Sequence, residues 1–479
     1  MIQITSMMKR LGFLLLVSGG LPVQADESDD LIQLIDRQSS TFNELALDIW
    51  DDAELGYQEV QSSGRLQSLL SAQGFEVTAG VAGIPTAFVA SYGEGKPVIG
   101  ILAEFDALPG ISQAATPVRQ QLEGKTSGHA CGHHLFGAGS VSAAVALRQW
   151  MAQSGTPGTI RLYGTPAEEG GSGKVYLVRA GLFEDVDTVL HWHPSDRNSA
   201  NAETSLANKS ARFKFHGISS HAAAAPERGR SALDGVEAMN FMVNLMREHV
   251  PQETRIHYVI TKGGEAPNVV PDYAEVYYYV RHTQAEMLLE IWDRVLDAAK
   301  AGALGTGTRV EVEVMHGNHS LLPNETLARR MHANLTRVGG VTYTPEEQAF
   351  AETLSESLNA GPFLGMEQEI MPYEVRQGMG STDVGDVSWV VPTVGLRTAT
   401  WVPGTAAHSW QAVAAGGTSI GTSGMQVAAR AMALTARDLL QNPGLLNAAR
   451  AEFEKARGEG FIYESLLGDR DPPLDYRSH

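Results

Sequence analysis

The middle of the chain, from Asn208 to His316, has the apolar pattern of a self-contained folding unit. Its segments switch between period-two alternation and helical spacing in the order β-α-β-β-α-β, which is the order of a ferredoxin-like unit. The predicted strands are Ala211–His216, Arg255–Thr261, Ala274–Val280 and Arg309–Met315, and the predicted helices are Ser231–Glu248 and Ala285–Ala303. We therefore expect an inserted second domain of α+β type that spans residues 208–319.

The rest of the chain alternates helical and strand-like segments. Apolar residues from Leu31 to Leu70 recur at helical spacing with a break at Gly56, and Val98–Leu102 is a short run of the buried-strand kind. The alternation continues with a helix at Val141–Met151, a strand at Thr159–Tyr163, a helix at Val175–Ala180, an extended segment at Thr188–Leu190 and a helix at Met425–Leu440. This order predicts an α/β fold with helices around a central sheet.

Length supports a division into two domains, because 479 residues exceed the size at which one hydrophobic core keeps growing. We expect the first domain to be discontinuous and to consist of residues 26–207 and 320–457. Residues 458–479 are polar and contain Gly458, Gly460, Pro472 and Pro473. We expect this tail to trail along the surface.

The first 25 residues resemble an export signal. Lys9 and Arg10 precede the apolar run Leu11–Val17, and Val23–Ala25 offers a small-residue cleavage site. We expect the mature protein to be periplasmic or secreted; the alternative is an N-terminal helix that stays in the fold. The formal net charge of −19 argues against a nucleic-acid partner. The apolar run is too short to span a bilayer, so we expect no membrane partner after the signal is removed.

Three histidines and the single cysteine of the chain lie within one short segment, Ser127-Gly-His129-Ala-Cys131-Gly-His133-His134. Thiolate and imidazole are preferred ligands of zinc-like cations, and Gly132 permits a turn between Cys131 and His133. A lone cysteine cannot form an internal disulfide, so Cys131 is either a metal ligand or a buried, inert thiol beside surface histidines.

Further donors follow predicted strands. Glu168 and Glu169 come after Thr159–Tyr163, and adjacent acids point in different directions, so one can bind metal while the other acts as a base. The alternative is a solvated acidic turn. Asp106, His193 and His408 complete the set. The five donors Cys131, His133, Glu169, His193 and His408 suit two cations better than one, with Asp106 supporting them from outside.

The order Asp106-Ala-Leu-Pro109, His129-Ala-Cys-Gly-His133, Pro166-Ala-Glu-Glu-Gly-Gly171 and a late histidine resembles the metal-dependent amidohydrolases related to aminoacylase, carboxypeptidase G and the plant auxin-conjugate hydrolases. Leu190-His-Trp-His-Pro194 and Gly380-Ser-Thr-Asp-Val-Gly-Asp-Val-Ser388 point to the p-aminobenzoyl-glutamate hydrolases among them. The resemblance implies a zinc-peptidase-like catalytic domain with two Zn or Mn ions and a smaller lid domain that mediates dimerisation.

By motif position, the resemblance makes Glu168 the general base and Cys131, His133, Glu169 and His408 ligands. His193 and His191 are both candidates for the remaining ligand position, and we favour His193 because relatives carry a histidine directly before the proline.

The lid carries further matches to the family. The segment Gly217-Ile-Ser-Ser-His221 resembles the one whose histidine stabilises the developing oxyanion, in several relatives across the dimer. Gly264–Pro271 resembles the loop whose asparagine, here Asn268, assists there, and Arg281 fits the arginine that binds the substrate carboxylate. The alternatives are a strand-end histidine, a turn asparagine and a surface cation.

Glu104 departs from the family pattern, because relatives usually carry His or Asp two positions before Asp106. It would place an additional carboxylate near the metals and could alter metal preference. The segment between Pro109 and Gly132 is longer than in many relatives and could reshape the pocket entrance.

Together these features predict an exported two-metal amidohydrolase that cleaves N-acyl or N-aroyl amino acids of the p-aminobenzoyl-glutamate kind to a carboxylic acid and an amino acid. The alternatives are a metal-dependent dipeptidase or aminopeptidase, and a non-catalytic metal-dependent binding protein. We expect a homodimer; the alternative is an assembly with a related partner chain.

Overall fold

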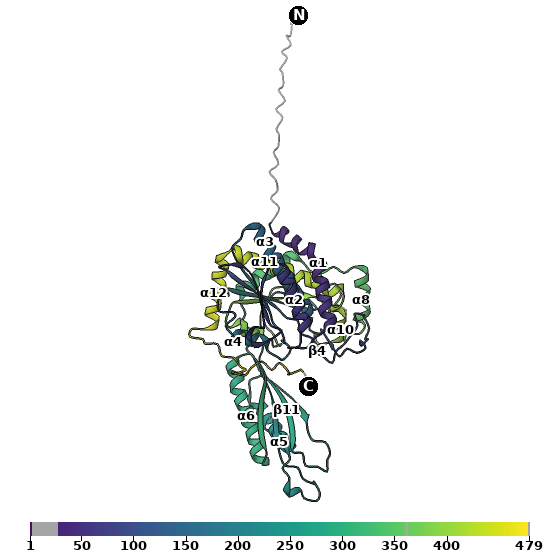
Figure 1. Cartoon of the computed structure of the whole chain (residues 1–479), viewed down its shortest axis with the longest axis vertical. Coiled ribbons are helices and arrows are strands. Elements are labelled where there is room, and N and C mark those ends of the chain that lie inside the picture. The colour runs from purple at the N-terminus through teal and green to yellow at the C-terminus, as the bar shows by residue number, and fades with distance from the viewer. Residues whose placement is uncertain (2–26, 360–362, 478–479) are drawn as a thin grey trace.

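The computed structural model describes Met1, residues 27–359 and residues 363–477, and it shows a large α/β domain joined to a slender second domain (Figure 1). Apart from Met1, the export signal predicted for residues 1–25 lies outside the described residues. Among the described helices, none combines the length and the apolar character that a membrane crossing requires.

A six-stranded sheet forms the centre of the large domain. Its strand order is β1-β2-β6-β3-β7-β14; β3, β6, β7 and β14 run parallel, while β1 and β2 are antiparallel additions at one side. The inner strand β3 is buried along its whole length, as expected of a parallel strand covered on both faces. The strands are β1 (Glu76–Ala79), β2 (Phe88–Glu94), β3 (Val98–Ala103), β6 (Gly158–Gly164), β7 (Thr188–Ser195) and β14 (Thr393–Ala399).

The helices of this domain include α1 (Glu27–Asp52) and α2 (Val60–Ala72), which replace the predicted stretch Leu31–Leu70 and its break at Gly56. The others are α3 (His133–Ser154), α4 (Gly173–Arg179), α7 (Glu325–Val338), α8 (Pro345–Ser355), α9 (Val384–Ser388), α10 (Trp410–Gly416), α11 (Ser419–Gln441) and α12 (Pro443–Arg457), with a 3-10 turn at Val81–Gly83. Two small sheets complete the domain, β4 (Leu108–Pro109) with β5 (Ser127–Gly128), and β8 (Ala202–Thr204) with β13 (Val375–Gln377).

Helix α3 packs against α1, α11 and the central sheet. The sequence predicted this helix only from Val141, whereas it begins at His133. A helix buried on nearly all sides has no polar face, so its first turns lack the periodicity that marks an amphipathic helix. Small residues allow the close approach: a Cβ at Gly137 would lie 2.8 Å from the carbonyl oxygen of Glu104, just after β3.

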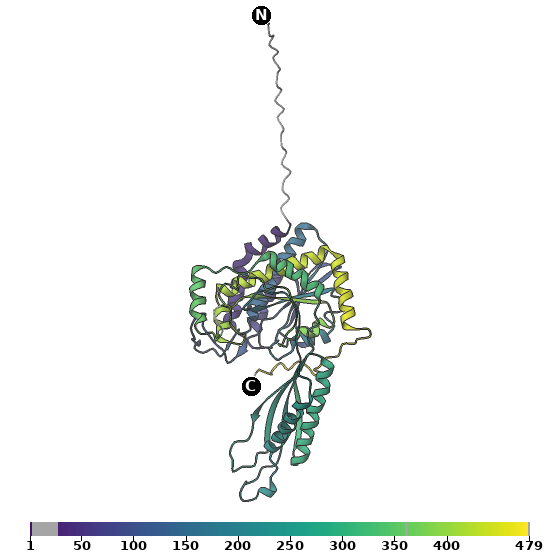
Figure 2. The same cartoon turned by 180° about the vertical axis from the view of Figure 1, so that it is seen from behind.

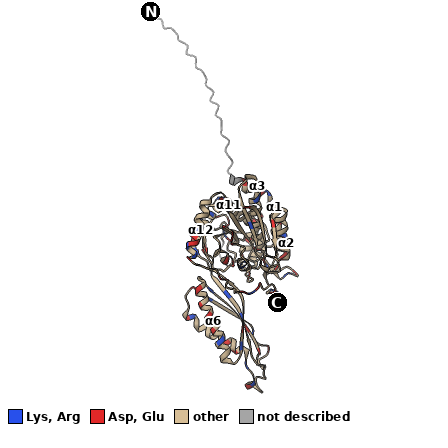
Figure 3. Cartoon of the chain, turned by 60° about the vertical axis from the view of Figure 1, so that its left-hand side comes forward, with Lys and Arg blue, Asp and Glu red and all other residues tan. Residues whose placement is uncertain are grey.

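The second domain has the predicted β-α-β-β-α-β order. Its four-stranded antiparallel sheet runs β10-β11-β9-β12, so the first strand lies between the third and the fourth, as in a ferredoxin-like fold. Acidic residues line the outer face of α6 (Figure 3), while its apolar face packs on the sheet. The elements are β9 (Ala207–His216), α5 (Ala232–Met246), β10 (Arg255–Lys262), β11 (Tyr273–His282), α6 (Ala285–Thr306) and β12 (Arg309–Asn318), with 3-10 turns at Pro226–Arg228 and Arg247–His249.

Most of the described tail, residues 458–477, is exposed or half-buried, as expected of a surface segment, but Leu466 and Leu467 anchor it. After α12 the chain returns between the two domains, and the C-terminus lies at their junction (Figures 1 and 2). Leu466 and Leu467 are buried, and the Lys209 ammonium donates to the Leu466 carbonyl at 2.5 Å. Leu467 packs in the core of the large domain and Leu466 in the core of the second domain. The polar composition of the tail as a whole does not indicate these two contacts.

The tight contact at Gly137 generates a stability prediction. Gly137→Ala would push α3 away from the end of β3, and we expect it to destabilise the protein by about 1–3 kcal/mol. Gly64→Ala is the matched control, because no atom lies within 4 Å of a Cβ at Gly64 in α2. An alanine in a helix interior should stabilise there by about 0.5–1 kcal/mol. Urea unfolding of both variants measures the difference, and equal effects would contradict the packing described.

Candidate active site at the carboxyl ends of the sheet

The carboxyl ends of the parallel strands meet at one edge of the sheet, where open α/β sheets assemble their sites. Glu104 and Asp106 follow β3, the acidic pair Glu168 and Glu169 follows β6, and His193 lies on β7. Two other segments reach the same edge: the start of α3 with its preceding turn, and the loop before α10. They bring Cys131, His133 and His408.

The five predicted metal donors come together in two groups. Cys131, His133 and His193 form one group, and Cys131, Glu169 and His408 form the other, with the donor atoms of each group within 4.8 Å of one another. Cys131 Sγ lies 3.4 Å from His193 Nε2, and His408 Nε2 lies 3.0 Å from Glu169 Oε1. The thiol belongs to both groups, so it has the position of a ligand shared between two ions.

Hydrogen bonds on the far side of two imidazole rings turn their other nitrogen toward this cluster. His133 Nδ1 lies 2.9 Å from Asp106 Oδ1, and His193 Nδ1 lies 2.7 Å from the Pro194 carbonyl oxygen. In each pair the ring nitrogen donates, which leaves Nε2 available as a ligand. Asp106 therefore lies where the sequence predicted a supporting residue.

The donor set fits divalent ions on its own chemistry. It offers one sulfur, three imidazoles and one carboxylate, a mixture that suits zinc-like cations. Among the described residues, buried His133 Nε2 has no hydrogen-bond partner. Burial lowers the pKa of His193 far below its ordinary value and keeps it neutral, the form that binds metal. Hydrogen bonds with Cys131 and Glu169 raise the pKa of His408 to about 10.

The remaining histidines of the predicted motifs have other partners. His129 Nε2 and His134 Nε2 each lie 3.0 Å from a backbone carbonyl, those of Ile49 and Gly416, and burial lowers the pKa of both rings. They join loops rather than offer a donor to the cluster. His191 packs against β14 and belongs to none of the donor groups found among the described residues, so the geometry favours His193.

The two adjacent acids have opposite pKa shifts. Burial raises the pKa of Glu168 well above its ordinary value, and the charges of Glu104 and Glu169 raise it further. Burial also acts on Glu169, but its hydrogen bond with His408 outweighs this and lowers its pKa. Glu168 therefore has the property of a proton carrier, and Glu169 that of an anionic ligand.

The loop that carries the acids has a strained backbone held by neighbours that sequence reasoning missed. Ala167 and Ser172 have φ angles of 57° and 60°, in the left-handed region that side chains disfavour. Glu59 Oε1 accepts the Ala167 N–H at 2.9 Å, and the Tyr57 hydroxyl donates to the Gly171 carbonyl at 2.6 Å. The acidic pair thus depends on a segment far away in the sequence, which carries no local signal for this role.

The C-terminal tail supports the same loop. The Tyr476 hydroxyl donates to the Glu169 carbonyl oxygen at 3.1 Å, and Arg477 Nη2 donates to that oxygen at 2.5 Å. The Tyr476 ring also packs edge-on against Tyr57, with centroids 5.6 Å apart. The tail is therefore part of the framework of the site.

The predicted substrate residues of the second domain do not join this cluster within one chain. His221 and Asn268 lie in loops at the end of the sheet where His216 pairs with Tyr273. Arg281 lies at the opposite end, beside the large domain. A ten-residue strand is about 33 Å long, so His221 and Asn268 are remote from the donors of their own chain.

A cavity of about 220 Å³ opens beside the donors. Glu168, Glu169, Cys131, His193 and His408 line one part of it. Apolar side chains such as Leu322, Val394 and Leu396, with Asn201 and Arg397 among the polar ones, line the rest. A donor set of this kind, beside a carboxylate of raised pKa and a cavity, is typical of the class of metal-dependent hydrolases.

Comparison with known proteins agrees with this class. The model of peptidase family M20/M25/M40 matches residues 100–411. The chain is 40% identical over 455 residues to the B subunit of p-aminobenzoyl-glutamate hydrolase from Escherichia coli (strain K12), covering 89% of this chain and 94% of that protein. It is 32% identical over 435 residues to Xaa-Arg dipeptidase of Mus musculus, covering 88% and 90%.

The fold also matches a solved structure. A dinuclear metal-binding peptidase of the M20 family from Bacillus subtilis superposes with a TM-score of 0.57 at 19% identity, covering 85% of this chain and 99% of that one. The chain belongs to peptidase family M20/M25/M40 and is a hydrolase of amide bonds. The predicted resemblance to the metal-dependent amidohydrolases, and to the p-aminobenzoyl-glutamate hydrolases among them, is confirmed.

Proposed function

We propose that this chain hydrolyses N-acyl or N-aroyl amino acids, of which p-aminobenzoyl-glutamate is the first compound to test. The observation that carries the proposal is the position of Glu168, a carboxylate of raised pKa that lines the same cavity as four of the five donors, Cys131, Glu169, His193 and His408. The 40% identity to one of the subunits of p-aminobenzoyl-glutamate hydrolase, across nearly the whole of that subunit, supports the substrate class.

We propose that Cys131, His133, Glu169, His193 and His408 hold two divalent ions, Zn or Mn. Bound there, such ions lower the pKa of water toward neutrality and polarise the amide carbonyl. Glu168 takes the proton of the attacking water while the oxygen of that water bonds to the acyl carbon. The C–N bond then breaks, and Glu168 delivers the proton to the amine that leaves as the free amino acid.

A second copy of the chain is the partner that the geometry of the lid favours. Among the described residues of α5 and β10, Phe241 and Val259 are 65% and 56% exposed, and β10 is an unpaired edge of its sheet. An apolar edge of this kind suits pairing with another sheet. His221 and Asn268 would then enter the site of the second copy and stabilise the oxyanion.

Arg281, at the lid end nearest the large domain, is the proposed ligand of the substrate carboxylate. The name of the E. coli relative designates one subunit of an enzyme, so a related companion chain is the alternative to a homodimer.

We propose export to the periplasm or the medium on the basic and apolar pattern of residues 1–25.

A dipeptidase is the second candidate, because a relative of nearly full coverage is an Xaa-Arg dipeptidase. Its substrate would bring a free ammonium into the cavity. Of the described residues that line the cavity, Glu203 is the acid outside the metal cluster, and Arg376 Nη2 lies 3.1 Å from both of its oxygens. Because that carboxylate is already paired, the cavity favours an acylated amine.

The test measures free amino acid released from N-acyl amino acids, p-aminobenzoyl-glutamate and dipeptides, using metal-stripped protein to which Mn²⁺ or Zn²⁺ is added. We expect metal-dependent release from the acylated compounds. Glu168→Gln should lower turnover at least about 100-fold, because the proton carrier is lost, and should leave the binding of two ions unchanged.

Each outcome has a separate meaning. Wild-type turnover by Glu168→Gln would show that the base is assigned wrongly. Release from dipeptides alone would identify a dipeptidase. Binding of two ions without any release would favour a missing companion chain or a non-catalytic binding protein.

The proposed dimer predicts complementation between two inactive variants. When Glu168→Gln and His221→Ala chains are co-expressed, mixed dimers contain one site with both residues intact, and activity should recover to about one quarter of wild type. Co-expression of Glu168→Gln with Cys131→Ala is a matched control for the mixing. In that pair each site has either an intact Cys131 or an intact Glu168 but never both, so no activity should return. An absence of recovery with His221→Ala would contradict action across the dimer.

A further inference from the structure

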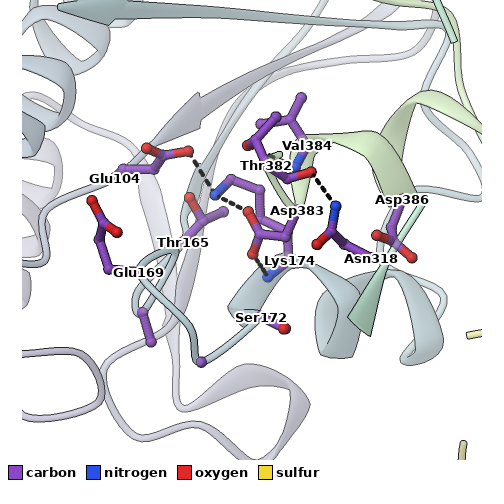
Figure 4. A network of polar contacts seen from close by, with 12 residues as sticks. Glu104, Thr165, Glu169, Ser172, Lys174, Asn318, Thr382, Asp383, Val384 and Asp386 are labelled. Carbon is purple, nitrogen blue, oxygen red and sulfur yellow. Dashed lines mark hydrogen bonds and ion pairs between the residues drawn. The ribbon is translucent and has the colours of Figure 1, made fainter. Parts of the chain in front are cut away.

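A lysine lies buried beside the proposed metal centre. Lys174, in the first turn of α4, has its Nζ 2.7 Å from Glu104 Oε1 and 2.7 Å from Asp383 Oδ1 (Figure 4). Its backbone N–H also donates to Asp383 Oδ2 at 2.9 Å. All three side chains are at most 1% exposed. One buried ammonium therefore lies between two buried carboxyl groups.

The other oxygen of Glu104 is free of this network and is directed at the donors. Glu104 Oε2 lies 3.1 Å from His133 Nε2, yet the two atoms are not aligned for a hydrogen bond, and neither has a hydrogen-bond partner in the part of the chain that the structure describes. His133 engages Asp106 through Nδ1, so Nε2 is the ring nitrogen that faces the Glu104 carboxylate. A cation between these two buried atoms, a proton on the imidazole or a metal ion in its place, stabilises their close approach.

The spacing of these atoms suits a common ion. Glu104, His133 and Glu168 form a further group whose donor atoms all lie within 4.8 Å of one another. Ligands at ordinary zinc distances lie roughly 3.0–3.5 Å apart in a tetrahedral arrangement, and the 3.1 Å between Glu104 Oε2 and His133 Nε2 falls in that range.

We propose that Glu104 Oε2 is an additional ligand of the ion that His133 holds, and that Lys174 and Asp383 position it. The inference rests on the proposed metal centre and adds to it a sixth donor. Lys174 occupies Oε1 and compensates part of the negative charge, so the carboxylate keeps one orientation with Oε2 toward the metal. A carboxylate oxygen is a harder ligand than thiolate or imidazole, so it shifts the preference of this position from Zn²⁺ toward Mn²⁺.

The test is a titration of metal-stripped protein with Mn²⁺ and with Zn²⁺ against a competing chelator. Glu104→Gln keeps the shape of the side chain and an oxygen for Lys174 but removes the charge. We expect the affinity of one of the two sites to fall at least about 10-fold, more for Mn²⁺ than for Zn²⁺, while the other site is unchanged. The visible spectrum of the Co²⁺-loaded variant should change as the coordination of that ion changes.

Asp386→Asn is the matched control. Asp386 is equally buried and lies three residues from Asp383, but Tyr463 Oη at 2.7 Å and the His319 N–H at 3.0 Å occupy its two oxygens. Its metal affinities should equal those of wild type. Thermal unfolding of the metal-stripped proteins shows whether each variant folds. If Glu104→Gln does not fold, Glu104→Asp takes its place. The aspartate keeps the charge but is too short to reach both Lys174 and the ion, so the affinity of the same metal site should fall.

The outcomes separate this proposal from the proposed function. Unchanged affinities in a folded Glu104 variant, beside a wild type that binds two ions, would overturn the role of Glu104 alone and leave it as a partner of Lys174. A wild type that binds no divalent ion would overturn the metal centre itself, and the proposed function with it.

Discussion

One buried carboxylate ties the parts of the site together. Asp106 Oδ1 bonds to His133 at the start of α3, and Asp106 Oδ2 accepts the N–H of Glu169 in the loop after β6. Burial alone would raise the pKa of Asp106, but His133 and the Glu169 N–H outweigh it and lower the pKa to about 2. Through these two bonds, Asp106 fixes the start of α3, whose preceding turn carries Cys131, relative to the loop that carries the acidic pair.

The surroundings of Asp106 explain how this edge of the sheet tolerates strained backbone and neighbouring like charges, both of which lower the stability of the folded state. Ala167, Ser172 and His408 all have positive φ angles, each unfavourable by about 1–3 kcal/mol, and several carboxylates lie close together. The four parallel strands provide a rigid base, while Glu59, Tyr57 and the C-terminal tail hold the loop from outside. Stability elsewhere in a large core is what permits strain and like charges at the place where chemistry is proposed.

Local patterns of apolar residues explain which parts of the fold and the site could be predicted from the sequence. Val98–Leu102 and Thr159–Tyr163 are short apolar runs, and the donors that follow them had to lie at strand ends, so their convergence was predictable. Pairings over long distances carry no such signal: Lys174 and Asp383 are 209 residues apart, and Tyr476 reaches Glu169 from 307 residues away. The remote position of His221 follows from the direction of β9, which the order of motifs along the chain does not reveal. The start of α3 was missed because a helix buried all round has no amphipathic period.

The central claim is that two ions share Cys131 at this edge of the sheet. Anomalous diffraction from crystals of the purified protein grown with Mn²⁺ or Zn²⁺ tests it most directly. The account predicts two peaks in each chain, roughly 3.5–4 Å apart, with the sulfur of Cys131 within bonding distance of both. A single peak, or two peaks of which one lies beyond the reach of Cys131, would contradict it.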